Sequence, residues 1–188
     1  MRSEDPVPYL RWPDVRIVFV STSGVFASIT RWAARSPVNH VYLEVPVWGR
    51  RMVCDATMRH GVRMMPHAPM GVRVVATYRC HFDTTPGIYS LMDQLGRPYD
   101  HCDRFGTAWM SLAWRWLRLK IKNWRWNTRA IKSSQLSVLF IKACNVRSTS
   151  LVPDRTDLVD MLGWCQTRPG WFERVQGAPP HLAQRERR

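Results

Sequence analysis

Short strand-like segments follow one another through the first half of the chain and limit the folds open to it. They are Val15–Ser21, His40–Val45, Arg51–Ala56, Gly61–Met65 and Val72–Tyr78. β-branched residues and an alternation of apolar with polar side chains are typical of β-strands. Most connections between the segments are short enough for hairpins, and hairpins join antiparallel strands. The segments therefore predict an antiparallel sheet, arranged as a meander or a partial barrel.

The rest of the chain predicts helices. From Cys102 onward, apolar residues recur in steps of three and four, which defines one face of a helix. Further helices are predicted at Phe26–Arg35, Thr85–Leu95, Ser134–Cys144 and Asp154–Cys165. Asp154 with Asp157 resembles an acidic variant of a capping box at the start of the last helix. A sheet accompanied by helices that pack on it predicts the α+β class.

Length and cysteine spacing fit one domain without a cofactor. The 188 residues are enough to bury a core. We expect a single domain over residues 1–175 and a basic, disordered tail over 176–188, where the chain is rich in proline and then in arginine. The five cysteines include no CxxC pair, which argues against a disulfide framework and a zinc site. We predict neither a metal nor a cofactor, and we interpret Cys54, Cys144 and Cys165 as core residues.

The charge of the chain indicates a polyanionic partner. The formal net charge is +14, and a charge of this size attracts nucleic acid, anionic lipid or acidic polymers without choosing among them. Arginines and lysines alternate with tryptophans between Trp109 and Trp126. Such a segment is typical of base stacking or of a membrane interface, although one face packed on the sheet would explain it equally well. No recognised nucleic-acid motif is present.

Two segments far apart in the chain carry the elements of an acyl-transfer site. His40 opens a predicted strand, and Ser133 with Ser134 opens a predicted apolar helix. A histidine base and a nucleophile at a helix N-terminus are the two components that acyl transfer needs. We expect the imidazole and the hydroxyl to meet across a groove between the sheet and the helices. Asp55, one hairpin from His40, is placed to hold the imidazole tautomer, as in a catalytic triad.

The order of several local motifs supports this interpretation. They are the entry from Ile17 to Trp32, Ser36-Pro37-Val38-Asn39-His40-Val41, Val53-Cys54-Asp55-Ala56 followed by Gly61-Val62-Arg63, Leu95-Gly96-Arg97-Pro98-Tyr99-Asp100, Ser133-Ser134-Gln135-Leu136 and Leu151-Val152-Pro153-Asp154. Together they resemble the circularly permuted branch of the papain-like, NlpC-type superfamily of cell-wall amidases and peptidases. Members of that superfamily occur in bacteria and as phage-encoded proteins. The resemblance covers most of the chain, from Val15 to Leu162.

The resemblance implies a permuted papain-like fold and a thiol-protease-like site. Carried over by motif, the nucleophile is Ser133, the base is His40 and the orienting group is Asp55. Two residues depart from the family pattern, because Ser133 stands where the family has cysteine and Gln135 where it has glutamate. A helix dipole lowers the pKa of a thiol, but a serine hydroxyl must pass its proton to a base. Ser133 is therefore a working nucleophile, the relic of an inactive site, a deliberate replacement of cysteine, or a residue matched to the motif in the wrong register.

Each candidate residue could also have a purely structural role. Ser133 or Ser134 would serve as a helix N-cap, His40 as an ordinary core or surface histidine, and Asp55 as a hairpin aspartate bonded to its own backbone. Glu44 is a substitute for Asp55, since it lies on the same strand face as His40. Cys102 falls in the apolar stripe of a predicted helix and is interpreted as a core residue. No role is assigned to the other histidines.

Two functions follow as expectations. The first is a phage-encoded or bacterial relative of peptidoglycan hydrolases, an amidase or endopeptidase if active, with a degraded site in which Ser replaces Cys. The second is a catalytically inactive structural or assembly protein of a virion, whose basic, Trp-rich surface binds a partner protein or nucleic acid. The N-terminus lacks the apolar stretch of a signal peptide, and no run approaches the roughly 20 apolar residues that span a bilayer. We therefore expect the cytoplasm of the producing cell or the virion.

Overall fold

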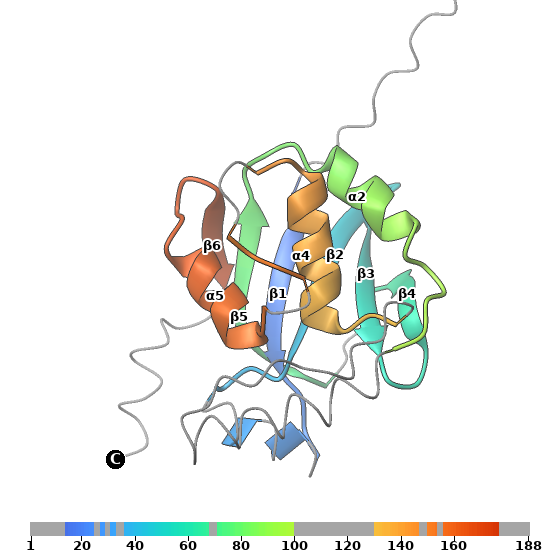
Figure 1. Ribbon diagram of the computed structural model, residues 1–188, viewed down its shortest axis with the longest axis vertical. Helices are drawn as coiled ribbons and strands as arrows, with labels where there is room; N and C mark the ends of the chain where they lie inside the picture. Colours follow the sequence, from blue (N-terminus) through green and yellow to red (C-terminus); the bar gives the residue numbers. More distant parts are fainter. Residues whose placement is uncertain are drawn as a thin grey trace, which may run out of the picture.

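The described part of the chain is an α+β unit with one antiparallel sheet and helices on one of its faces (Figure 1). The computed structural model describes residues 14–24, 27–28, 31–32, 36–67, 71–99, 130–146, 150–153 and 156–176. The helix predicted from Cys102, the Trp-rich segment and residues 177–188 of the predicted tail lie outside the described residues, whereas Gln176, the first residue of that tail, ends a strand. The α+β class and the antiparallel sheet are confirmed.

Six described strands form the sheet in the order β4-β3-β2-β1-β5-β6. Their bounds are β1 Arg16–Ser21, β2 His40–Val47, β3 Arg50–Thr57, β4 Gly61–Pro66, β5 Arg73–Cys80 and β6 Phe172–Gln176. The first four strands are a meander, as predicted, and β5 returns to pair with the free edge of β1. The sheet stays open, because β4 and β6 lie at opposite ends of this order.

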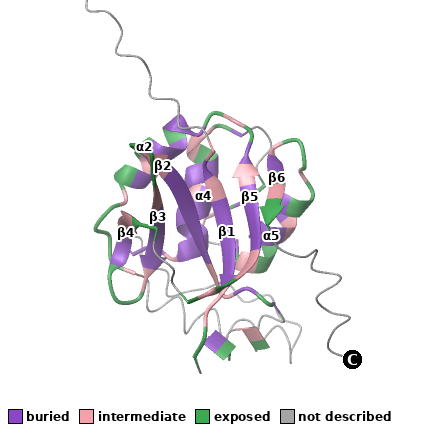
Figure 2. Ribbon diagram, turned by 180° about the vertical axis from the view of Figure 1, so that it is seen from behind, coloured by how far each residue is buried: buried purple, intermediate pink, exposed green. Residues whose placement is uncertain are grey.

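Three described helices are long enough to name, and all lie on the same side of the sheet (Figures 1 and 2). They are α2 Thr85–Met92, α4 Ser133–Ala143 and α5 Leu158–Gln166. The predicted start of the last helix at Asp154 is wrong. Its N-cap is Asp157, whose carboxylate accepts a hydrogen bond from the backbone N–H of Asp160 at 2.7 Å. A side-chain acceptor for one of the free N–H groups of the first turn favours a helix start at this residue.

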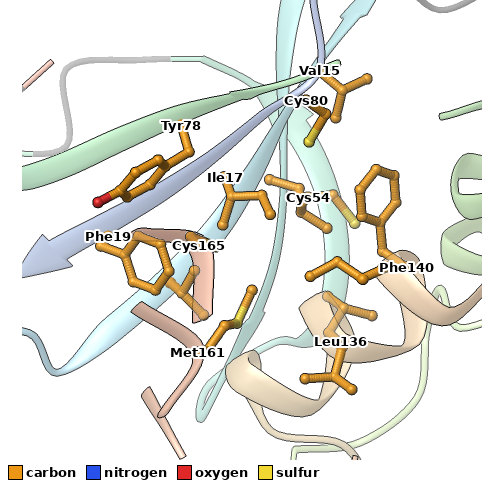
Figure 3. Close-up of a cluster of buried hydrophobic side chains, with 14 of the residues drawn as sticks. Val15, Ile17, Phe19, Cys54, Tyr78, Cys80, Leu136, Phe140, Met161 and Cys165 are labelled. Carbon is orange, nitrogen blue, oxygen red and sulfur yellow. The ribbon is translucent and has the colours of Figure 1, made fainter. Parts of the chain in front are cut away.

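The main core lies between the sheet and the helices. Alternate strand residues point toward α4, among them Ile17 of β1, Leu43 of β2 and Cys54 of β3, and they pack with Leu136 and Phe140 of the helix (Figure 3). The intervening residues face the other side. There Val18, Val20, Tyr42 and Val53 form a second, smaller buried cluster. The central strands are therefore buried on both faces, and the register decides which side chains belong to which face.

The cysteines behave as core residues where the structure describes them. Cys54, Cys80 and Cys165 are buried, Cys144 is partly buried, and all four are free thiols. Burial raises the pKa of Cys54 and of Cys144 to about 12, and raises those of Cys80 and Cys165 as well. Such thiols carry almost no thiolate at neutral pH, so they are poor nucleophiles. The core interpretation of Cys54, Cys144 and Cys165 agrees with this; Cys102 lies outside the described residues.

Candidate functional site

His40 and Asp55 are brought together by the β2–β3 hairpin. His40 is the first residue of β2, and Asp55 lies near the end of β3. The hairpin register pairs Leu43 with Cys54, so Tyr42 lies opposite Asp55 and His40 is its diagonal neighbour on the same face. The His40 Nε2 atom lies 3.9 Å from Asp55 Oδ2. The structure thus brings the predicted pair onto one strand face, at a separation longer than a hydrogen bond.

Arg63 completes the surroundings of the Asp55 carboxylate. Arg63 is the cross-strand partner of Asp55 on β4, and its Nε donates a hydrogen bond of 3.0 Å to Asp55 Oδ1. The Asp55 side chain is only 3% exposed, while those of His40 and Arg63 are 19% and 31% exposed. A buried carboxylate needs such partners, because desolvation of an unpaired charge is costly. Asp55 is therefore held between a guanidinium and an imidazole.

Tyr42 lies beside this pair and is not itself acidic. Its ring centroid is 6.5 Å from that of His40, and its side chain belongs to the second buried cluster. Burial, with the nearby carboxylates of Glu44 and Asp55, raises the pKa of the Tyr42 phenol to about 12. The phenol stays protonated at neutral pH and acts only as a hydrogen-bonding group.

Ser133 is the first residue of α4 and is buried within the helical layer. The predicted N-cap role of Ser133 or Ser134 is wrong, because Lys132 occupies the cap position. The Gln135 side chain accepts from the Lys132 backbone N–H at 3.5 Å, and Ser134 Oγ donates to the Thr156 carbonyl at 3.2 Å. Ser133 itself accepts a hydrogen bond from Ser137 at its carbonyl. The helix start is therefore fixed by contacts that leave the Ser133 hydroxyl without a hydrogen-bond partner among the described residues.

The register separates the histidine from the serine. Val41 and Leu43, the neighbours of Tyr42, face α4, whereas His40, Tyr42 and Asp55 face the other side of the sheet. Ser133 begins the helix that covers the first of these faces. The register thus turns the His40–Asp55 pair to the face opposite the one that α4 covers.

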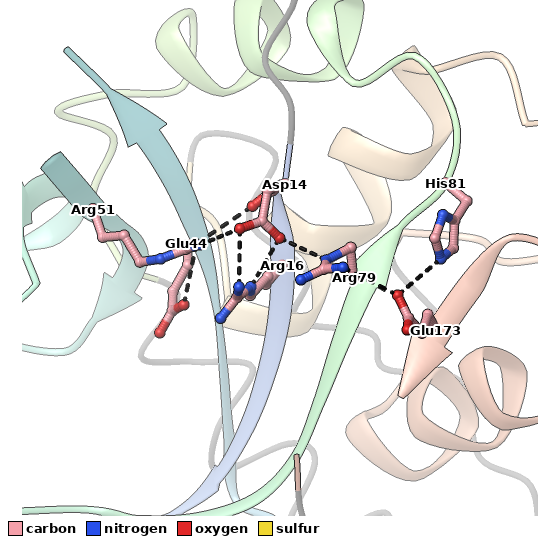
Figure 4. Close-up of polar contacts among 7 residues, drawn as sticks. All are labelled: Asp14, Arg16, Glu44, Arg51, Arg79, His81 and Glu173. Atoms are coloured by element: carbon pink, nitrogen blue, oxygen red, sulfur yellow. Dashed lines mark hydrogen bonds and ion pairs between the residues drawn. The ribbon is translucent and has the colours of Figure 1, made fainter. Parts of the chain in front are cut away.

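Asp14 is the centre of an ion-pair network that the sequence did not predict (Figure 4). Its carboxylate accepts hydrogen bonds from Arg16 at 2.9 and 3.0 Å, from Arg79 at 2.7 Å and from Arg51. Arg16, Arg79 and Arg51 come from β1, β5 and β3. Burial raises the pKa of Asp14, but the three arginines outweigh it and lower the pKa to about 2. Asp14 thus joins three strands electrostatically.

The network extends outward through two glutamates. Glu44, the proposed substitute for Asp55, instead lies 3.7 Å from Arg51 and 3.4 Å from His67. At the β5–β6 end of the network, Glu173 of β6 lies 3.2 Å from His81 and 3.3 Å from Arg79. Both glutamates therefore take part in holding strands together. No sequence signal links these residues, since they are far apart along the chain.

The described residues offer no metal site, and the depression found among them lies elsewhere. No group of three or more His, Cys, Asp or Glu side chains in the described ranges is arranged to hold a metal ion. A shallow, open depression lies between residues 150–152 and α5, lined by residues such as Leu151, Gly163 and Trp164. Its lining includes neither His40 nor Asp55 nor Ser133. None of the described helices has the length and apolar character needed to cross a bilayer.

A comparison of the chain with protein-family models, curated proteins and solved structures finds no match.

Proposed function

We propose that this chain is a catalytically inactive, papain-like protein related to phage or bacterial peptidoglycan amidases and peptidases, which acts as an assembly component of a virion. The observation that carries the proposal is the strand register, which turns the His40–Asp55 pair to the face opposite the one that α4 covers. Motif order along the chain supports the ancestry, and the antiparallel sheet with helices on one face is compatible with it.

The chemistry of acyl transfer supports the loss of activity. A serine hydroxyl attacks only when a base accepts its proton in the transition state, so the two groups must be within hydrogen-bond reach. The strand register supports the absence of this reach, because it turns His40 to the face of the sheet opposite the one that α4 covers. A misplacement of about 1 Å already costs on the order of a hundredfold in rate. The four described thiols are no substitute, because burial raises their pKa values.

Charge supports a binding role for the protein. The net charge of +14 favours an acidic partner, such as a partner virion protein or nucleic acid. The Trp-rich segment proposed as the contact surface lies outside the described residues, so the charge of the whole chain carries this part of the proposal.

A second candidate function is an active peptidoglycan amidase or endopeptidase. The His40–Asp55 contact at 3.9 Å favours it, because a carboxylate that orients an imidazole is part of a catalytic triad. In that case His40 is the general base, Ser133 the nucleophile, and backbone N–H groups near Ser134 form the oxyanion hole.

Hydrolysis of purified peptidoglycan fragments by four proteins tests both functions. They are the wild type, Ser133→Ala, Ser133→Cys and the control Ser137→Cys, which places a thiol one turn further along the same helix. Inactivity of all four is expected, with a known amidase as the positive control for the substrate. Hydrolysis by the wild type that Ser133→Ala lacks would establish the second function. Activity gained by Ser133→Cys and not by Ser137→Cys would overturn the proposed loss of site geometry.

A further inference from the structure

The tip of the β2–β3 hairpin places a tryptophan in an unfavourable backbone conformation. Val47 pairs with Arg50, so only Trp48 and Gly49 form the turn. Their φ angles are 47° and 73°, the left-handed values that a tight primed turn requires. Asparagine and glycine adopt this conformation readily, whereas a bulky residue there is strained. The first turn position therefore holds a residue that the turn itself disfavours.

The same tryptophan is almost fully exposed. Trp48 is 94% exposed, more than any other large apolar residue in the described part of the chain. Arg50, which pairs with Val47 in the ladder, is also exposed, and no ion pair or side-chain hydrogen bond joins its guanidinium to the described residues. Val47, by contrast, packs against the main core and anchors the hairpin. The hairpin tip thus carries an exposed aromatic residue and an exposed arginine two positions apart in the chain.

Neither feature is explained by folding. A strained turn residue and an exposed indole both work against the folded, soluble chain, and such departures from local rules gather at functional sites. Their coincidence at one hairpin tip indicates a contact with a partner.

We propose that Trp48 and Arg50 form a contact site for single-stranded nucleic acid. An unpaired base stacks on the indole face, and the guanidinium of Arg50 binds a neighbouring phosphate. Aromatic stacking accepts any base, because every base has a π-face, and the positive charge follows the backbone. The inference rests on the proposed binding role and names its partner. Its test measures binding rather than hydrolysis, so the two proposals can fail separately.

The composition of the tip favours nucleic acid over a lipid surface. Membrane-interface segments combine several apolar side chains on one face. Here Trp48 has Gly49 and Arg50 after it, and Val47 packs on the core. One ring beside one cation matches the stacking of one base and the contact of one phosphate. The chain charge of +14 attracts a polyanion to the surface as a whole.

Fluorescence anisotropy of a labelled oligothymidylate, titrated with full-length protein at several salt concentrations, tests the proposal. The key variant is Trp48→Asn, which removes the ring and supplies a residue that the turn prefers, so the hairpin stays folded. We expect it to weaken binding about tenfold or more. Arg50→Ala is expected to weaken binding and to reduce the slope of log affinity against log salt by about 0.7.

A matched control and a lipid arm make the outcome decisive. Tyr89→Ala removes an exposed aromatic residue, 54% exposed, from α2, and is expected to bind the oligothymidylate like the wild type. Equal affinity of Trp48→Asn and wild type would overturn the proposal, as would an equal loss in Tyr89→Ala. Binding to phosphatidylserine vesicles that depends on Trp48, without binding to the oligothymidylate, would assign the tip to lipid and overturn it too.

Discussion

Gly87 of α2 lies directly against the aromatic ring of Phe140 in α4. A Cβ added at position 87 would approach the ring atoms Cδ2 and Cε2 to 2.5 and 2.7 Å, and would also overlap the sulfur of Cys144. Real side chains do not reach such distances. The missing side chain therefore sets how closely α2 can approach α4, and with it the thickness of the helical layer over the core.

Gly87→Ala is expected to destabilise the protein by about 1–3 kcal/mol, because overpacking forces Phe140 or the helix to move. Urea unfolding followed by circular dichroism measures the change. The usual gain from replacing glycine by alanine inside a helix, about 0.5–1 kcal/mol, works in the opposite direction and is outweighed here.

Gly163→Ala is the matched control. Gly163 lies inside α5, and a Cβ built there meets no atom within 4 Å. The substitution is expected to stabilise the protein by about 0.5–1 kcal/mol through helix propensity alone. If Gly87→Ala and Gly163→Ala changed the free energy of unfolding in the same direction, the close approach at Gly87 would be contradicted.

Arg63→Met leaves the buried Asp55 carboxylate without its guanidinium. We expect a loss of about 2 kcal/mol or more in the free energy of unfolding at neutral pH, because removing one member of a buried pair strands the other charge. The double variant Arg63→Met/Asp55→Asn should recover part of this loss, since it also removes the stranded charge. A double-mutant cycle of unfolding free energies measures the coupling. A double variant no more stable than Arg63→Met would argue against a stranded charge.

Asp14→Asn tests the ion-pair network through pH. Asp14 has a folded-state pKa of about 2 against a reference of 3.8, so its contribution is present above pH 4 and is lost as the pH falls through about 2. We expect the variant to be less stable by of order 1 kcal/mol at pH 7, because solvent screens these partly exposed pairs. Below pH 2 the two proteins should be equally stable.

Urea unfolding at a series of pH values measures how the difference in unfolding free energy between Asp14→Asn and the wild type decreases at low pH. Asp93→Asn, which changes an exposed aspartate at the end of α2, is the control and should change stability by less than about 0.5 kcal/mol. A constant difference between Asp14→Asn and wild type from neutral pH to pH 2 would exclude an ionic origin.

The described thiols are expected to resist labelling in the folded protein. At pH 8 a thiol with a pKa of about 12, as for Cys54 and Cys144, carries on the order of a thousandfold less thiolate than an ordinary cysteine. In a Cys102→Ser background, Ellman's reagent should react slowly until urea unfolds the chain. Rapid reaction of one thiol in the native state would show that a cysteine is accessible and activated.

Local patterns were sufficient to predict most of the sheet. The five strands from β1 to β5 were placed within one or two residues, because their hydrophobic pattern and the short hairpins between them are local signals. Strand β6 was missed, since Phe172–Gln176 alternates only weakly and exists through its pairing with β5. The start of α5 is misplaced because Asp154 and Asp157 are both suitable caps by sequence, and the helix has Asp157 as its N-cap.

The candidate site shows a different limit. Alternation correctly predicted that His40 and Asp55 share a strand face across one hairpin. It did not determine which face α4 covers, because β2 is buried almost continuously from Val41 to Val45 and both faces look alike in the sequence. The Asp14 network was invisible for a related reason. Its arginines at positions 51 and 79 meet Asp14 across 37 and 65 residues of chain.

The position of β6 also bears on how the protein is made. β6 is the only described strand on the outer side of β5, and its Phe172 fills a place in the main core. During synthesis, the edge of β5 therefore remains open until the ribosome has released residues 172–176. A nascent or prematurely terminated chain presents an unpaired strand edge beside a core lacking one aromatic ring, and such edges recruit other chains. Loss of these few residues is expected to increase aggregation of the expressed chain.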